Sequence, residues 1–378
     1  MRIALVHDYL IDFGGAERVL LALSKMYPKA PIYTIYYKNT SPCGPVFKDK
    51  KIIQSWFSYL PFAGKLISPL RFLIPLIWNS FDFSKYDLVI TSASWAVTKG
   101  MRGAKKEICY LHTPPRYLWG YDTSRDWQGL WFAGAVRVYA LIVNHFMRMY
   151  DFSQAQKVTY FIANSKNVGK RIEKFYRRKD YKIIYPAVDN FAPTEVPLRG
   201  TKGGMAGYYL TGGRMVRTKN FDLIIKACKK AQVKLKVFGS GVEENNLRKI
   251  AGKNVEFLDR VSDAKLADLY ANAKAFVVAQ KDEDFGMTPA EAASYGTPTI
   301  AYRAEGYLES VVEDNLPAQA GTGLFFDELT TNSIARAINK SEKIKWDKDV
   351  IRNHAKKFNA EIFEKEVRSI IQKYAGIT

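Results

Sequence analysis

The chain has 378 residues, of which 57 are Lys or Arg and 37 are Asp or Glu, so its formal net charge is +20. Its apolar content of 47% and aromatic content of 14% exclude a disordered chain, and its length allows two domains with a core each. Three widely spaced cysteines form neither a disulfide framework nor a metal-binding pattern, which fits a reducing compartment. The charge favours nucleic acid, an anionic membrane surface or phosphorylated ligands as partners. The sequence carries no nucleic-acid-binding motif, so we expect no nucleic-acid partner.

The N-terminal stretch predicts a strand over residues 3–7, because its apolar run is too short for a signal peptide. Gly14 and Gly15 then precede a helical run, and glycines at this point allow the backbone to approach a ligand closely. The pair does not form the GxGxxG motif of dinucleotide-binding proteins. A tight turn is the alternative role of these two glycines.

Residues 57–81 are strongly apolar, but Lys65, Arg71 and three prolines interrupt them. A membrane-spanning helix needs about 20 apolar residues without such interruptions. A charged, aromatic and amphipathic segment is better suited to the membrane interface, and the basic balance of the chain favours this interpretation. The alternative is an ordinary pair of buried helices.

Strands are predicted over 86–92 and 107–111, and the second leads into the sequence HTPPRYLW. His112 therefore follows a strand and is held by a Thr-Pro-Pro turn, which is a suitable place to point into a cleft. A structural role is the alternative, because imidazole nitrogens bond to many ordinary partners.

A strand over 160–164 is followed by a helix that Ser165 caps. The basic residues of that helix are interpreted as a solvated face: Lys166, Lys170, Arg171 and Lys174. Prolines and glycines concentrate in 186–205, which is the predicted linker between two domains. After it the pattern of strand, glycine and helix starts again, so the second half is expected to repeat the architecture of the first.

The second half begins with a strand that ends at Gly213 and Arg214, and Lys219 lies five residues further on. A planar guanidinium and a mobile ammonium group suit a diphosphate. Surface charge at the start of a helix is the alternative role. A strand over 234–239 then leads into a GSG loop at Gly239, and another over 255–258 precedes Arg260.

The most informative stretch is 281–298, KDEDFGMTPAEAASYGTP, which lies between two apolar runs of strand length. Thr288 is predicted to cap a helix, with Glu291 three residues later in a capping box, and capping alone is the alternative role of Glu291. Gly286 allows close backbone approach just before a helix N-terminus, which attracts anions. The acidic residues before it suit hydroxyl donors, so the stretch predicts a phosphorylated ligand rich in hydroxyl groups.

This stretch resembles the E-x7-E motif of family-4 retaining glycosyltransferases in its EDFGxxPxEA form. The resemblance implies an α/β chain with the GT-B fold, in which two Rossmann-like domains face each other across a cleft. It places an acceptor-side domain at 1–190, a nucleotide-sugar domain at 191–355 and a helix that crosses back to the first domain at 356–378.

The resemblance also implies roles for individual residues. Glu283 contacts the donor sugar, Glu291 contacts the ribose, and Arg214 with Lys219 matches the GRxxxxK element that binds the diphosphate. The sequence around His112 is similar to the HTPxRY signature of O-antigen-type mannosyltransferases, in which the histidine faces the donor sugar. The expected catalytic residues are therefore His112, Glu283, Arg214 and Lys219. The expected donor-binding residues are Gly14, Gly15, Gly213, Gly239, Arg260, Val261, Asp284, Phe285, Gly286, Met287, Thr288 and Glu291. The expected acceptor-side residues are Arg116 and Trp119.

The implied reaction transfers a hexose, with mannose from GDP-mannose favoured, to a lipid-linked glycan in bacterial surface-polysaccharide assembly. Without an evident nucleophile, we expect attack from the face that the phosphate leaves. No cofactor and no metal are expected, and the nucleotide sugar is a co-substrate. The expected location is the cytoplasm, peripheral on the inner face of the cell membrane. A GT-B nucleotide-sugar epimerase and a non-catalytic basic protein that binds membrane or nucleic acid are the alternatives.

Overall fold

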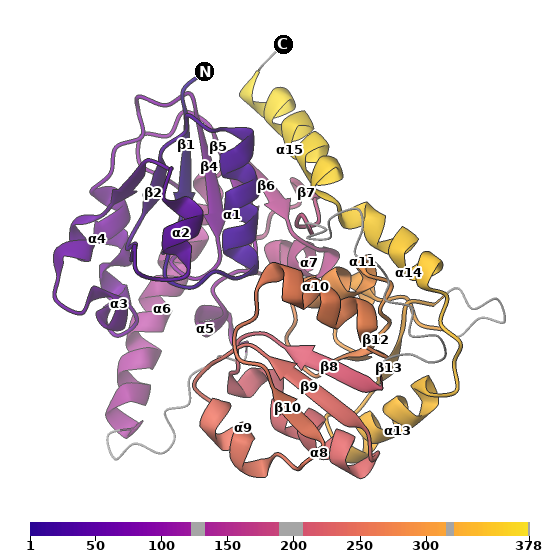
Figure 1. Ribbon diagram of the computed structural model, residues 1–378. Helices are drawn as coiled ribbons and strands as arrows, with labels where there is room; N and C mark the ends of the chain where they lie inside the picture. The colour runs from indigo at the N-terminus through magenta and orange to yellow at the C-terminus, as the bar shows by residue number, and fades with distance from the viewer. Residues whose placement is uncertain (122–132, 189–206, 315–320, 377–378) are drawn as a thin grey trace. The chain divides into compact units, whose positions relative to one another are not determined.

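The computed structural model describes residues 1–121, 133–188, 207–314 and 321–376 (Figure 1). The chain divides into two compact units. Unit 1 comprises Met1–Ala187 together with Ala360–Thr378, and unit 2 comprises Val188–Asn359. In each unit a parallel sheet packs helices on both faces, so the predicted α/β class with two Rossmann-like halves is confirmed.

Within the described residues, unit 1 holds a seven-stranded sheet in the order β3-β2-β1-β4-β5-β6-β7, with every pair parallel. The strands are β1 (Ile3–His7), β2 (Ile32–Thr34), β3 (Ile52–Gln54), β4 (Leu88–Ala93), β5 (Glu107–Leu111), β6 (Tyr160–Ala163) and β7 (Tyr181–Ile183). The register of β1 and β4 sets His7 beside Ser92. Because the strands are parallel, their carboxyl ends share one edge, where ligands bind in sheets of this kind.

The helices in the described part of unit 1 cover three buried apolar clusters. They are α1 (Gly15–Met26), α2 (Cys43–Phe47), η1 (Trp56–Tyr59), α3 (Ala63–Leu66), η2 (Arg71–Leu73), α4 (Ile74–Asn79), α5 (Arg116–Trp119), α6 (Ala133–Lys157), α7 (Lys166–Tyr176) and α15 (Ala360–Ala375). Leu5 of β1 packs in the core that α1 and α15 cover, whereas its neighbours Ala4 and Val6 pack in the core that α4 and α6 cover. This alternation is the ordinary consequence of the strand's two-residue period.

Unit 2 repeats this plan with a sheet that is six-stranded in the described part of the chain, in the order β10-β9-β8-β11-β12-β13, again parallel. Its strands are β8 (Tyr208–Gly212), β9 (Lys234–Phe238), β10 (Val255–Phe257), β11 (Phe276–Val278), β12 (Thr299–Tyr302) and β13 (Gly323–Phe326). The loops that follow β8, β9, β10 and β11 therefore leave the sheet at the same edge, and they carry the predicted donor-binding residues of this half.

The helices of unit 2 again divide between the two faces of the sheet. They are η3 (Arg217–Lys219), α8 (Phe221–Lys230), α9 (Glu244–Ile250), α10 (Asp263–Asn272), α11 (Met287–Ser294), α12 (Tyr307–Ser310), α13 (Thr331–Ser341), α14 (Lys348–Ala355) and η4 (Lys356–Phe358). Helices α8 and α13 pack on one face, and α10 and α11 pack on the other. Side chains of α14 share a smaller core with Ala293 of α11.

The apolar segment 57–81 folds as the short helical pieces η1, α3, η2 and α4. Some of its side chains, such as Phe57 and Trp78, are buried in the core of unit 1. Others are exposed, including Tyr59 at 87% and Phe62 at 75%. Among the described residues, no helix is both long and apolar enough to cross a bilayer. The predicted linker 186–205 lies almost entirely outside the described residues.

Candidate active site

His112 is the first residue after β5, at the carboxyl edge of the unit 1 sheet. Its backbone N–H donates to the carbonyl oxygen of Ala93 at 2.9 Å, which extends the pairing of β5 with β4. The residue is only 8% exposed, and its Nε2 lies 2.9 Å from Oγ of Ser92. The structure therefore places this predicted catalytic residue at a strand end and connects its ring to the neighbouring strand.

A chain of hydrogen bonds leads from His112 to the beginning of α1. Oγ of Ser92 also lies 3.1 Å from Nδ1 of His7. Nε2 of His7 faces Oε1 of Glu17 at 3.4 Å, and Oε2 of Glu17 accepts from the N–H of Gly14 at 2.8 Å. Gly14 is the N-cap of α1, and Gly15 is its first residue. Two of the predicted site residues, Gly14 and His112, are thus joined through side chains that the sequence motifs did not select.

His7 and Glu17 form the charged part of this chain. Burial lowers the pKa of His7, but the hydrogen bond and negative charge of Glu17, with Asp8 nearby, outweigh burial and raise the pKa above its usual value. Burial raises the pKa of Glu17, but the hydrogen bond and charge of His7 outweigh it and lower that pKa. Both shifts favour the charged forms, an imidazolium on His7 and a carboxylate on Glu17.

In unit 2, the loop after β8 carries the two predicted diphosphate-binding cations. Gly213 has a φ of +115°, a conformation that side chains rarely adopt. A Cβ added to Gly213 would lie 3.1 Å from Nζ of Lys219, so the ammonium group lies against the backbone of this turn. Lys219 is the last residue of η3, and Arg214 is exposed at the start of the loop.

The loops after β9 and β10 lie directly beside the Gly213 turn. Gly239 has a φ of +106°, and a Cβ added to it would lie 2.1 Å from the carbonyl oxygen of Gly213. Nε of Arg260 donates to Oγ of Ser240 at 3.0 Å. Val261 is partly buried and packs in a core of unit 2. Glycine is therefore required at position 239, where the loops after β8 and β9 meet. Arg260 connects the loop after β10 to the loop after β9.

A contact with the residue directly after β11 places the start of the stretch 281–298 at the same edge of the sheet. Nδ2 of Asn220, directly after Lys219, donates to the carbonyl oxygen of Ala279 at 2.7 Å. The chain then turns through the predicted residues and enters α11. The turn carries Glu283, Asp284, Phe285 and Gly286, and α11 begins with Met287 and Thr288.

The predicted capping box of α11 is wrong. The helix begins at Met287, with Gly286 as its N-cap in the left-handed region at a φ of +89°, and Thr288 is already its second residue. Glu291 therefore lies too far inside the helix to cap it. Oε1 of Glu283 instead accepts from the N–H of Gly286 at 3.3 Å. The predicted end of the helix is confirmed, since Gly296 follows the last turn with a φ of +76°.

The two glutamates of the motif occupy different environments. Oε2 of Glu283 accepts from the hydroxyl of Tyr307 at 3.4 Å in the turn before α11. Glu291 is buried on α11, and its Oε2 accepts from the hydroxyl of Tyr270 at 3.3 Å. Carboxylates are costly to bury unless they have polar partners or a function. Glu291 is therefore more than a surface residue of a helix.

Each unit thus presents its own chemistry at the carboxyl edge of its sheet. Unit 1 offers an imidazole that is connected to a buried ion pair. Unit 2 offers glycine turns, a lysine ammonium group and carboxylates that can receive hydroxyl hydrogen bonds. In the parts of the chain that the structure describes, no three His, Cys, Asp or Glu side chains gather closely enough to hold a metal ion.

Comparison with known families agrees with this geometry in both halves. A family model described as "Glycosyltransferase Family 4" matches residues 13–190. A second, described as "Glycosyl transferases group 1", matches residues 201–358. The chain is a glycosyltransferase of the GT-B type.

Two curated relatives of this glycosyltransferase have different named activities. Alpha-1,3/1,6-mannosyltransferase ALG2 of Candida glabrata is 23% identical over 428 residues, which cover 97% of this chain and 90% of that protein. The UDP-N-acetylglucosamine--peptide N-acetylglucosaminyltransferase GtfA subunit of Streptococcus pneumoniae is 26% identical over 175 residues, or 44% of this chain and 34% of that protein.

A solved structure shows the same fold over the full length. HepE of Anabaena, in complex with UDP-glucose, matches with a TM-score of 0.70 at 16% identity, over 99% of this chain and 100% of that one.

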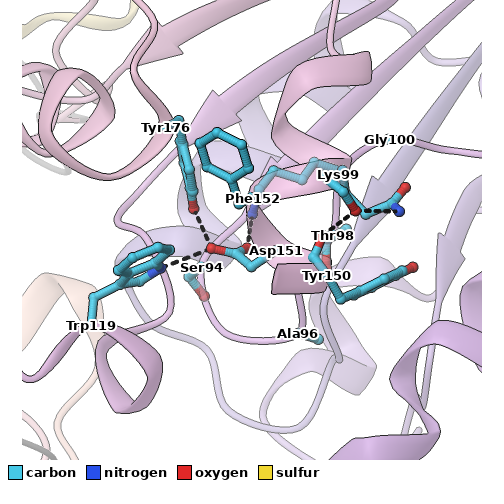
Figure 2. A network of polar contacts seen from close by, with 12 residues as sticks. Ser94, Ala96, Thr98, Lys99, Gly100, Trp119, Tyr150, Asp151, Phe152 and Tyr176 are labelled. Carbon is cyan, nitrogen blue, oxygen red and sulfur yellow. Dashed lines mark hydrogen bonds and ion pairs between the residues drawn. The ribbon is translucent and has the colours of Figure 1, made fainter. Parts of the chain in front are cut away.

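In this glycosyltransferase the predicted acceptor-side residue Trp119 belongs to a buried polar network (Figure 2). Nε1 of Trp119 donates to Oδ2 of Asp151 at 2.8 Å, and the hydroxyl of Tyr176 donates to the same oxygen at 2.9 Å. Lys99 forms an ion pair with the other carboxylate oxygen. These contacts anchor Trp119 within unit 1. Arg116 begins the same short helix and is partly buried, and an acceptor-side role for either residue stays a prediction.

The interpretation of α7 as a uniformly solvated basic face is wrong at one position. Arg171 is only 4% exposed, and its guanidinium donates to Oγ1 of Thr113 at 2.8 Å. It also lies 4.0 Å from the centroid of the Tyr121 ring. Arg171 therefore fixes the residue that follows His112. The prediction that Ser165 caps this helix is confirmed, since its side chain accepts from the N–H of Val168.

Sequence motifs missed the residues that support His112, which are His7, Glu17, Ser92 and Arg171. A usable signal was present for two of them. His7 and Ser92 are polar residues at the carboxyl ends of apolar strands, where α/β sheets place their sites. Glu17 and Arg171 carry no such signal, because charged residues on helices are usually solvated.

Proposed function

We propose that this protein is a retaining hexosyltransferase whose donor is a nucleoside diphosphate sugar. The observation that carries the proposal is the Lys219 ammonium group, which lies against the Gly213 turn at the carboxyl edge of the unit 2 sheet. A glycine turn allows close backbone approach, and the cation suits a diphosphate. The HepE structure contains UDP-glucose in a protein of the same fold, which supports this class of donor.

Each donor-binding residue has a role that its environment allows. Lys219 and Arg214 neutralise the negative charge that grows on the diphosphate as it leaves. Backbone N–H groups at the beginning of α11 add donors for the phosphate oxygens. The Glu283 carboxylate accepts hydrogen bonds from the sugar hydroxyls, and Glu291 accepts from the ribose.

The proposed step proceeds with retention of configuration. The acceptor hydroxyl attacks the anomeric carbon from the face that the diphosphate leaves. Its oxygen bonds to that carbon as the bond to the diphosphate oxygen breaks, and the hydroxyl proton passes to the departing oxygen. His112 donates a hydrogen bond to the donor sugar, and neither a metal nor a cofactor takes part.

We favour mannose from GDP-mannose as the transferred sugar. The HTPPRYLW sequence around His112 and the similarity to a mannosyltransferase along nearly the whole chain support this choice. The relative named as an N-acetylglucosaminyltransferase matches less than half of the chain. The acceptor that we propose is a lipid-linked glycan of bacterial surface polysaccharide.

An exposed apolar surface on unit 1 supports the proposal that the protein binds to a membrane. On α6 the exposed apolar residues recur along one helical face, and they are Val138, Leu141, Ile142, Phe146, Met149 and Phe152. The segment 56–76 adds further exposed apolar residues, which are Trp56, Tyr59, Phe62, Phe72 and Leu76. Contacts hold the two parts together, since Arg71 donates to Asn144 of α6 at 2.9 Å and lies 4.9 Å from the Tyr139 ring centroid.

We infer that this unit 1 surface binds the anionic inner face of the cell membrane. Aromatic and aliphatic side chains insert at the interface, and the net charge of +20 attracts the anionic headgroups. The acceptor lipid is then presented to the enzyme at the surface where it resides.

The donor is tested by a thermal-shift screen of GDP, UDP and ADP sugars, followed by mass analysis of the products. We expect stabilisation by GDP-mannose and transfer of its hexose to an alkyl hexoside. Conversion of the donor into an epimer without an acceptor would instead identify an epimerase. If no nucleotide sugar stabilises the protein, a non-catalytic basic protein is the better interpretation.

The role of Glu283 is tested by Glu283→Ala, with Glu256→Ala on the exposed edge of the unit 2 sheet as the matched control. We expect Glu283→Ala to abolish transfer while the affinity for the nucleoside diphosphate changes little, because the sugar is the only part of the donor that we propose this carboxylate contacts. The control should retain both properties. Equal loss of transfer and of diphosphate affinity would contradict a sugar-binding role.

Membrane binding is tested by sedimentation with vesicles of phosphatidylglycerol and of phosphatidylcholine. The variant Phe62→Ser with Leu141→Ser removes two apolar side chains that are 75% and 72% exposed. We expect its affinity for anionic vesicles to fall at least about tenfold, since burying each such side chain contributes roughly 1.5–3 kcal/mol. Val242→Ser, an exposed apolar residue of unit 2, is the control. Equal binding by all three proteins would refute the surface.

A further inference from the structure

His7 lies between two groups that can only accept hydrogen bonds. Its Nδ1 is 3.1 Å from the carbonyl oxygen of Ser92, and its Nε2 is 3.4 Å from the carboxylate of Glu17. With a proton on each ring nitrogen, His7 donates to both of these oxygens. The carboxylates of Glu17 and Asp8 supply the negative charge around the resulting imidazolium, which is 1% exposed.

The protonation of His7 favours one direction for the next hydrogen bond. Its Nδ1–H also lies 3.1 Å from Oγ of Ser92, so this hydroxyl oxygen receives a hydrogen bond. The hydroxyl then has its own proton to donate, and Nε2 of His112 lies 2.9 Å away. A ring nitrogen that accepts a hydrogen bond carries no proton. When Ser92 donates to Nε2 in this way, neutral His112 carries its proton on Nδ1.

We propose that His7 and Ser92 are positioning residues, which fix the tautomer and the ring orientation of His112 through the chain Glu17–His7–Ser92–His112. The proposal rests on the role of His112 given under the proposed function. An imidazole with one defined N–H presents a hydrogen-bond donor in one direction without having to reorganise during the reaction. Preorganised donors of this kind stabilise charge in the transition state more than in the ground state.

The position of each residue in the fold supports this role. His7 ends β1, Ser92 lies in β4, and His112 follows β5, three strands that are neighbours in the sheet. Glu17 belongs to the first turn of α1 and also accepts from Gly14. These hydrogen bonds therefore link the glycine turn before α1 to His112 through rigid strands, which hold side chains in position more precisely than loops do.

The tautomer is measured directly by long-range ¹H–¹⁵N spectra of protein labelled with ¹⁵N-histidine. The chain has only four histidines, so single substitutions assign each ring. We expect His7 to show two protonated nitrogens, and His112 to show a protonated Nδ1 and an unprotonated Nε2. A protonated Nε2 in neutral His112, rapid exchange between both tautomers, or a neutral His7 near pH 6.5 would overturn the proposal.

Kinetics of Ser92 variants test the consequence for catalysis. Ser92→Ala removes the hydroxyl, and we expect kcat to fall about 10–100-fold with little change in the KM for the donor. Ser92→Thr keeps a hydroxyl and should recover most of the loss. Ser55→Ala is the matched control, because Ser55 is a buried serine of unit 1 whose hydroxyl donates to Ile35. A change in KM alone, or no rescue by threonine, would contradict a positioning role.

Two substitutions of His7 separate its two hydrogen bonds. His7→Asn places an amide N–H near the position of Nδ1 and keeps a donor for Ser92, whereas His7→Gln places one near Nε2 and keeps a donor for Glu17. We expect His7→Asn to retain at least about tenfold more activity, because the bond to Ser92 sets His112. Equal activity of the two variants would contradict the proposal that His7 acts on His112 through its hydrogen bond to Ser92.

Failure of the proposed function can be told apart from failure of this inference. If the wild-type protein transfers no sugar from any nucleotide donor, the proposed function fails. The histidine spectra still decide whether Ser92 fixes the His112 tautomer, because they require no substrate.

Discussion

The buried network around Asp151 yields the strongest stability prediction. Asp151 on α6 is 0% exposed and pairs with Lys99, which is 1% exposed (Figure 2). Its other oxygen accepts from Trp119 on α5 and from Tyr176 on α7. Asp151→Ala therefore removes, in one change, the partner of a buried cation and the acceptor of two further donors.

The size of the stability loss depends on the groups that Asp151→Ala leaves without a partner. Removing one member of a buried ion pair costs roughly 3–5 kcal/mol, because the other charge stays buried without compensation. A donor without an acceptor costs about 1–3 kcal/mol more when no water reaches it. These terms overlap, so we expect Asp151→Ala to lower the free energy of unfolding of unit 1 by about 4 kcal/mol or more.

Urea unfolding followed by circular dichroism measures this loss. The matched control is Asp222→Ala, because Asp222 pairs with Lys226 on the surface of α8, where the side chains are 43% and 50% exposed. Exposed pairs contribute about 0–1 kcal/mol, so the control should change little. Lys99→Met combined with Asp151→Leu should recover part of the loss, since no charge is then orphaned. A loss below about 1 kcal/mol for Asp151→Ala, or one equal to that of the control, would refute this reasoning.

Three further predictions concern the loops and the charges of the site. Lys219→Met should weaken the binding of a nucleoside diphosphate about tenfold or more in calorimetric titration, and an unchanged affinity would remove this lysine from the site. Gly239→Ala should lower the free energy of unfolding by about 3 kcal/mol, because a Cβ would lie 2.1 Å from a backbone oxygen. Gly120→Ala is the control, because Gly120 has a φ of +78° but open space around it, and it should lower the free energy of unfolding by only about 1 kcal/mol. Equal losses in the two variants would contradict a steric clash at Gly239. The pKa of His7 is raised above its usual 6.5, so its contribution to stability is complete below pH 6.5 and is lost as pH rises through the raised value. The pKa of Glu17 is lowered below 4.5, so its contribution is present above pH 4.5 and is lost as pH falls through the lowered value. The difference in free energy of unfolding between the wild-type protein and His7→Gln should therefore be largest between pH 4.5 and 6.5. A difference that does not change with pH would contradict the ion pair between His7 and Glu17.

Continuous apolar runs predicted the central strands of the fold well. The predicted strands 3–7 and 107–111 have the bounds of β1 and β5, because buried parallel strands are apolar on both faces. The edge strands β3 (Ile52–Gln54) and β7 (Tyr181–Ile183) were missed. Each is three residues long and only partly buried, so neither has a distinct period.

The spacing of residues in the sequence predicted a wrong N-terminus for one helix, α11. It also could not predict contacts between residues that are far apart in the sequence. Thr288 and Glu291 have the spacing of a capping box, but Gly286 turns the chain two residues earlier in a left-handed conformation. The contacts of His112 with Ser92 and of Ser92 with His7 depend on strand order and register. No local pattern contains that information, which explains why the sequence pointed to His112 and not to the residues that contact it.

The configuration of the first-formed product tests the central proposal most directly. ¹H NMR can follow the anomeric proton while the enzyme transfers a hexose from an α-linked nucleoside diphosphate sugar to an alkyl hexoside. We predict an α-linked product together with one equivalent of released nucleoside diphosphate. A β-linked product, or a donor that changes without forming a glycoside, would contradict retaining transfer by this protein.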